Sequence, residues 1–99
     1  MARPLDIESL TWDDWNLLHI TKHEVSPEEV EDAVFGAAVV FPTYKNRHKL
    51  VGLTSSGRVL SVVVGQVPGE PHVYYVFSAR PASRKERREF AHAQEGLLS

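Results

Sequence analysis

The chain has 99 residues, a length that suits one domain and leaves no room for a second. It contains no cysteine, which excludes disulfide scaffolds, thiolate nucleophiles and cysteine-ligated zinc. No apolar run approaches the roughly 20 residues that span a membrane, and the N-terminus lacks the apolar segment of a secretory signal. We therefore expect a cytoplasmic protein without a membrane partner.

The formal net charge of −2 conceals an uneven distribution. Residues 1–36 carry nine acids and two bases, a net charge of −7, whereas residues 37–99 carry nine bases and four acids, a net charge of +5. Five of those bases fall between Arg80 and Arg88. This polarity predicts one acidic and one basic surface, each with its own kind of partner.

Two helices are expected in the N-terminal third, after a loose lead-in over residues 1–10. The first begins at Thr11, with Asp14 three residues on, and runs to about residue 23. The second has the stronger signals, because Ser26 and Glu29 form a capping box around a proline at the first helical position. Gly36 is its expected end.

The pattern then changes to strands, expected over residues 37–41, 48–54, 58–64 and 72–79. Residues 54–57 predict a hairpin turn, and residues 65–71 form a longer turn cluster. A third capping box, Ser83 with Glu86, starts a basic helix that ends near residue 94. The expected fold is a single α+β domain over residues 11–95, with two N-terminal helices, an antiparallel sheet of three to four strands and a C-terminal helix.

The basic segment at the last strand–helix junction is the first candidate for chemistry. Arg80 ends the strand, and the helix that follows opens with four more cations, which are Arg84, Lys85, Arg87 and Arg88. Cations beside free backbone N–H groups favour an anion or phosphate, and the planar guanidinium donates two hydrogen bonds in register. The alternative is a solvated helix that pairs with the acidic N-terminal helices.

Three further groups of residues have open interpretations. Arg58 shares a strand face with Leu60 and Val62, so it is either a solubilising edge charge or a residue at the rim of a site. His19 and His23 have the i, i+4 spacing of metal ligands without a third ligand, so packing is favoured, and His23 is also a candidate general acid or base.

The tyrosines are the third group with two open interpretations. Tyr74 and Tyr75 are out of phase in a strand, so one of them is expected to face away from the core. An exposed tyrosine such as that one, or Tyr44, is able to stack on a nucleic-acid base or to cover apolar sheet surface.

Four segments spread along the chain carry a resemblance to a known family. They are Trp12-Asp13, Lys22-His23-Glu-Val-Ser26 followed by Glu28-Glu29, Gly57-Arg58-Val-Leu-Ser-Val-Val63, and Ser78-Ala-Arg80-Pro-Ala-Ser-Arg-Lys-Glu86-Arg-Arg88. Together they resemble the BrnT family, the toxin halves of type II toxin–antitoxin pairs. The likeness covers about residues 11–92, and its last segment is the most specific. It implies a fold similar to that of the RelE-like ribonuclease toxins.

The resemblance implies an endoribonuclease that needs no metal or other cofactor and cleaves RNA by attack of the 2′-hydroxyl on the adjacent phosphorus. Arg58 and Arg80 would hold the phosphate, and Lys22 or His23 would transfer protons. Glu86 would orient an arginine, with the four cations after Arg80 as further phosphate contacts.

The resemblance also implies a protein partner, a small antitoxin that neutralises the toxin and binds operator DNA. The alternative function is a non-catalytic module on the same fold that binds protein or RNA. A homodimer through an exposed sheet edge is a further hypothesis.

Overall fold

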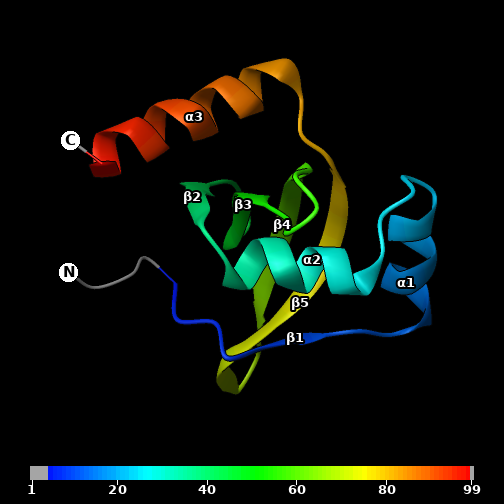
Figure 1. Ribbon diagram of the computed structural model, residues 1–99. Coiled ribbons are helices and arrows are strands. Elements are labelled where there is room, and N and C mark those ends of the chain that lie inside the picture. Colours follow the sequence, from blue (N-terminus) through cyan, green and yellow to red (C-terminus); the bar gives the residue numbers. More distant parts are fainter. Residues whose placement is uncertain (1–4, 99) are drawn as a thin grey trace.

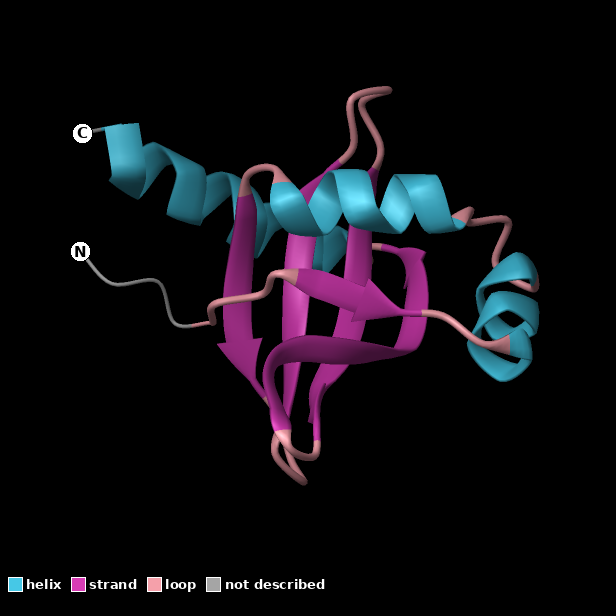
Figure 2. Ribbon diagram, turned by 90° about the horizontal axis from the view of Figure 1, so that it is seen from below, coloured by secondary structure: helices cyan, strands magenta, loops and turns pink. Residues whose placement is uncertain are grey.

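The computed structural model describes residues 5–98, with side chains up to residue 95. The elements are β1 (Ser9–Thr11), α1 (Asp14–Thr21), α2 (Pro27–Phe35), β2 (Ala38–Pro42), β3 (Arg47–Leu53), β4 (Val59–Val67), β5 (Glu70–Pro81) and α3 (Arg84–Leu98). The strands form one sheet in the order β1-β5-β4-β3-β2 (Figure 1). Figure 2 shows α2 in front of this sheet and α3 behind it, so the two helices cover opposite faces.

The α+β class is confirmed, but the expected sheet is wrong in two respects. It has five strands rather than three to four, and it is mixed, because β1 pairs with β5 in parallel while the other pairs are antiparallel. The additional strand, Ser9–Thr11, lies at the end of the segment predicted as a loose lead-in. Leu5, Ile7 and Leu10 pack against the core, which explains why this segment is held in place. Residues 1–4 of that segment lie outside the described residues.

The N-cap of helix α1 lies two residues later than Thr11, where it was expected. Its cap is Asp13, whose side chain accepts a hydrogen bond from the Asn16 backbone N–H, while the Asn16 side chain accepts one from the Asp13 N–H. Thr11 instead ends β1, and its carbonyl oxygen accepts a hydrogen bond from the fully buried Asn16 amide. The same amide also donates to the Val76 carbonyl of β5, so Asn16 ties the start of α1 to the sheet.

Helix α2 begins and ends as expected. Ser26 and Glu29 form the capping box, and Gly36 is the C-cap. The helix lies close to the sheet because β3 has a glycine beneath it: a Cβ on Gly52 would come within 2.4 Å of the Ala33 carbonyl oxygen. A side chain at that position would push the helix away from the sheet.

The hairpins set the length of the sheet. The turn expected over residues 54–57 is confirmed, with Gly57 at φ 93°. The turn cluster expected over residues 65–71 is confirmed only at residues 68–69, because β4 continues to Val67 and β5 starts at Glu70. Val67 still pairs with Glu70, and Gly69, at φ 81°, makes the tight turn between these two residues. The long hairpin extends β5 to Pro81, next to α3.

The core divides into two clusters, one on each side of the sheet. The larger joins α1 and α2 to alternate residues of β4, including Leu60, Val62 and Val64. The smaller lies under α3 and contains Val51, Ala82 and Phe90. Because α3 rests on so few residues, it covers only part of its face of the sheet and leaves the rest open for side chains from β3 and β5.

Candidate functional site

A capping box at the start of α3 forms the base of the candidate site. The Ser83 backbone N–H donates to Glu86 Oε1 at 2.8 Å, and Ser83 Oγ accepts from the Glu86 N–H at 3.1 Å. This confirms the predicted S-x-x-E helix start. Glu86 is only 5% exposed, so its carboxylate has left water and needs other partners.

Those partners come from three neighbouring strands. Arg80, at the end of β5, donates from both terminal guanidinium nitrogens to the two carboxylate oxygens of Glu86, at 2.8 and 3.0 Å. Lys49 Nζ of β3 lies 3.1 Å from Oε2, and Ser61 Oγ of β4 lies 3.2 Å from the same atom. Ser61 is the register partner of Arg80, so the alternation of the two strands brings both side chains to the α3 face.

These hydrogen bonds decide the protonation state of the carboxyl. Burial alone raises the pKa of Glu86, but the hydrogen bonds from Arg80, the Ser83 N–H and Lys49 outweigh it and hold that pKa well below its ordinary value. Glu86 is therefore an anion at neutral pH, with its oxygens fully occupied. It holds other groups in place rather than exchanging protons.

The two cations retain the capacity to bind an anion. The Arg80 side chain is 44% exposed and that of Lys49 is 29% exposed, although both contact the buried carboxylate. Two positive charges against one negative charge leave an excess of one positive charge at this place. Among the described hydrogen bonds of Arg80, none uses Nε, so donors remain for an incoming oxyanion.

The other cations of the predicted basic segment have a different setting. Arg84, Lys85, Arg87 and Arg88 are all exposed on α3. Arg87 donates to the Ala82 carbonyl, and none of the described ion pairs joins α3 to the acidic helices α1 and α2. The alternative interpretation, in which the basic helix pairs with the acidic helices, thus finds no ion pair in the described part of the chain.

Arg58 lies on the other side of the sheet. Its guanidinium donates to Glu29 Oε2 of α2 at 2.8 Å and to the Glu24 carbonyl at 3.1 Å. Arg80 instead contacts Glu86 of α3, and α2 and α3 cover opposite faces. The expectation that Arg58 and Arg80 hold the same phosphate is therefore corrected, since strand alternation separates them.

Lys22 and His23 lie at the C-terminal end of α1 and are both exposed. The His23 ring meets the His19 ring edge-on at 6.0 Å, and His19 in turn stacks on Trp15 at 5.1 Å. The histidine pair thus takes part in an aromatic stack. No described hydrogen bond or ion pair joins Lys22 or His23 to the Arg80–Glu86 cluster.

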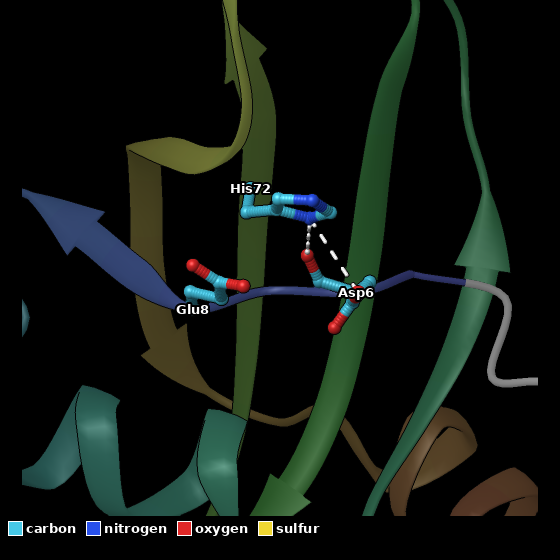
Figure 3. A group of neighbouring side chains, drawn as sticks. All are labelled: Asp6, Glu8 and His72. Carbon is cyan, nitrogen blue, oxygen red and sulfur yellow. Dashed lines mark hydrogen bonds and ion pairs between the residues drawn. The ribbon is translucent and has the colours of Figure 1, made fainter.

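A different trio meets the distance criterion for a metal site among the described residues. Asp6, Glu8 and His72 hold ligand atoms within 4.8 Å of one another, where β1 begins to follow β5 (Figure 3). His72 Nδ1 already contacts the Asp6 backbone carbonyl at 3.2 Å, and both acids are exposed. The trio is thus explained by local contacts between the two strands.

An open cleft lies on the α3 side of the sheet, beyond the part that α3 covers. It measures about 470 Å³ and is lined by Trp15, Arg47, Tyr75 and Phe77. Tyr74 is buried in the larger core cluster on the other side, which confirms that one of the two consecutive tyrosines faces away from that core. Tyr44 is exposed on the turn between β2 and β3.

The fold and this site describe an α+β domain in which a basic strand–helix junction borders an open sheet face. No protein-family model and no curated protein matches the chain. Among solved structures, it is similar to the Brucella abortus ribonuclease toxin BrnT, with a TM-score of 0.61 and 26% sequence identity. The similarity covers 77% of this chain and 97% of that one, so the chain has a BrnT-like toxin fold. No described helix is long and apolar enough to cross a membrane.

Sequence reasoning missed Lys49 and Ser61. A signal was present, because Ser61 interrupts an otherwise apolar strand and Lys49 alternates with Val51 in another. Which positions face each other, however, depends on the strand register. That register places Ser61 beside Val51 and also beside Arg80, which the sequence does not specify.

The Glu86→Gln variant tests the carboxylate as the centre of this cluster. We expect its free energy of unfolding at pH 7 to fall by about 1–3 kcal/mol, since an amide cannot neutralise two cations. The folded-state pKa of Glu86 is depressed, so its contribution is complete above the unfolded value near 4.5 and is lost as the pH falls below that value. Urea unfolding at pH 7 and at pH 3 measures both effects.

Glu89→Gln, one turn away from the cluster on the same helix, is the matched control and should leave the stability nearly unchanged. A Glu86→Gln variant that is as stable as the wild type at pH 7 would contradict the central role of this carboxylate. A stability difference that widens toward acid pH would also contradict it.

Proposed function

We propose that the protein is a metal-independent endoribonuclease toxin of the BrnT kind, which acts on cytoplasmic RNA and is neutralised by a small antitoxin. The observation that carries this proposal is the clamp of Arg80 and Lys49 on the buried Glu86. It presents fixed positive charge beside an open sheet face, in a fold similar to that of a ribonuclease toxin.

The cations supply the electrostatic part of the reaction. As the 2′-oxygen attacks the adjacent phosphorus, its proton leaves, the bond from phosphorus to the 5′-oxygen breaks, and that oxygen takes up a proton. The products are a 2′,3′-cyclic phosphate and a 5′-hydroxyl. Negative charge grows on the phosphoryl oxygens in the transition state, and Arg80 and Lys49 stabilise this charge. Because Glu86 already orients both cations, little reorganisation is needed when the phosphate arrives.

Glu86 acts in this scheme as a positioning residue. Its low pKa and its five hydrogen bonds exclude it as the base that accepts the 2′-hydroxyl proton. His23 and Lys22 remain the proposed proton-transfer groups, since both are exposed and carry side chains that exchange protons. The exposed cations Arg84, Lys85, Arg87 and Arg88 would contact more distant phosphates of the RNA.

Arg58 has a separate proposed role. Its hydrogen bonds to Glu29 and to the Glu24 carbonyl hold the start of α2 against the strand that follows Arg58. We therefore assign it to the support of the α2 face. The exposed acids of α2, which include Glu28, Glu31 and Asp32, form on that face a surface suited to a basic segment of the antitoxin. A homodimer remains a prediction.

The first test removes the clamped guanidinium. Arg80→Ala should lower the rate of RNA cleavage in EDTA by about 100- to 1,000-fold, the usual cost of losing one donor to a developing oxyanion. Purified protein incubated with a long RNA and analysed by gel electrophoresis provides the measurement. Lys45→Gln removes a cation from the turn between β2 and β3 and should cleave at the wild-type rate.

Three outcomes would contradict the proposal. Cleavage that EDTA abolishes would require a metal, and full activity in Arg80→Ala would place the chemistry elsewhere. A folded wild-type protein that leaves RNA intact and does not arrest bacterial growth would favour the non-catalytic binding module.

The second test addresses proton transfer. His23→Gln should reduce cleavage by about 100-fold or more and remove one limb of the pH–rate profile, because an amide cannot exchange a proton near neutrality. His92→Gln, which changes an exposed histidine on α3, is the control and should retain both limbs. An unchanged pH profile in His23→Gln would transfer the role to another group, with Lys22 examined next.

A further inference from the structure

The open cleft beside the cation clamp has the surfaces of a stacking site. Trp15 of α1 is 57% exposed, an unusual position for so large a ring, and it borders the cleft together with Arg47, Tyr75 and Phe77. Flat aromatic and guanidinium surfaces are the groups on which proteins stack unpaired nucleobases. The volume of about 470 Å³ lies within the range of small-molecule sites.

The inner wall of the cleft is held in place by its own contacts. The Arg47 guanidinium lies 3.7 Å from the centre of the Phe77 ring, and Tyr75 meets Phe77 edge-on at 5.0 Å. The Tyr75 hydroxyl donates to both carboxylate oxygens of Asp13, at 2.9 and 3.0 Å. The wall is therefore formed before any ligand binds, which reduces the entropy cost of binding.

The backbone under this wall is adapted to it. The pairing of β4 with β5 shifts register between Val63 and Val64, which leaves Phe77 as the extra residue of a bulge. A Cβ on Gly65 would lie 2.8 Å from the Phe77 ring, so glycine leaves the space in which that ring lies. Both features place an aromatic ring flat beneath Arg47.

The cleft shares a strand face with one of the cations that we assign to the phosphate. Arg47 and Lys49 lie two residues apart on the same face of β3, a spacing of about 7 Å along a strand. Lys49 and Arg80 share Glu86. A ligand with a flat ring joined to an anionic group therefore fits both parts, whereas an apolar peptide side chain would gain nothing from the cations and a basic segment would be repelled.

Resting on the proposed function, we propose that this cleft is a base-binding subsite, in which an unpaired RNA base stacks on Trp15 and on the Tyr75–Phe77–Arg47 wall while the adjacent phosphate contacts Lys49 and Arg80. In a duplex both faces of a base are covered by its neighbours. The subsite therefore restricts the protein to single-stranded RNA and positions the backbone next to the stacked base for attack.

The experiment measures binding separately from cleavage. A single-stranded 2′-O-methyl hexanucleotide, which lacks the attacking hydroxyl, is titrated into the wild type, Trp15→Ala and Leu18→Ala, with the affinity read from the fluorescence anisotropy of a labelled end. Trp15→Ala should bind about tenfold or more weakly, the usual effect of losing one stacked base. Leu18, 63% exposed on the same helix and not among the residues that line the cleft, is the matched control and should leave binding unchanged.

A second measurement starts with the wild-type protein and changes the RNA instead, so its first result does not depend on how a variant folds. A series of the same hexanucleotide with one abasic position each should contain one member that binds about tenfold more weakly. The Trp15→Ala variant should bind that abasic oligonucleotide and the complete one equally well, because it lacks the ring on which the missing base would stack.

The outcomes separate this subsite from the proposed function. The subsite is wrong if Trp15→Ala binds the complete hexanucleotide as tightly as the wild type does, and if the wild type binds every abasic oligonucleotide equally tightly. The proposed function stands in that case if Arg80→Ala still abolishes cleavage. Equal affinity for duplex and single strand would overturn the subsite as well. If the wild type neither binds nor cleaves RNA, both fail, and a loss of protein-partner binding alone in Trp15→Ala would assign the cleft to that partner.

Discussion

One buried carboxylate connects most of the parts on which the candidate site depends. Glu86 closes the capping box that starts α3, and it accepts hydrogen bonds from β3, β4 and β5 through Lys49, Ser61 and Arg80. A buried anion of this kind is stable only while its partners surround it. The same contacts that fix the helix on the sheet therefore also fix the two cations that face the solvent.

This arrangement explains how a chain with a net charge of −2 has a surface with an excess of positive charge, which the proposed function assigns to RNA. The acidic residues are concentrated in the part of the chain that contains α1 and α2, and α2 covers one face of the sheet. The clamp of Arg80 and Lys49 lies on the other face, under the start of α3. An RNA backbone bound there would be separated from the α2 acids by the thickness of the sheet, and a basic protein segment would find those acids on the opposite side.

The sequence was sufficient for features that depend on neighbouring residues. The capping boxes at Ser26 and Ser83 and the hairpin at residues 54–57 were all predicted, because their geometry is determined within a few positions. The resemblance to a toxin family implies that Glu86 orients an arginine, and the structure identifies that arginine as Arg80. The function itself was suggested by the same resemblance, and the similarity of the fold to a ribonuclease toxin supports it.

Features that depend on register and on parallel pairing were missed. The three residues of β1 are too few for a periodic pattern, and their partner Val73 lies far along the chain. Strand alternation places Arg58 on the face of Leu60 and Val62. That α2 covers this face and brings Glu29 to the guanidinium is a tertiary contact, which no spacing in the sequence reveals. Lys49 joins the site only because the sheet order sets β3 beside β4 and α3 above both.

The proposed function depends most on one interaction, the binding of RNA phosphate by Lys49 and Arg80 together. Its most direct test is the salt dependence of the affinity for a non-cleavable single-stranded RNA, because each phosphate contact contributes a slope of about 0.7 in a plot of log affinity against log salt concentration. A variant with Lys49→Ala and Arg80→Ala should bind more weakly, and its slope should be smaller by about 1.4, the sum for two contacts. A double variant that remains folded and keeps the wild-type slope would contradict this phosphate binding.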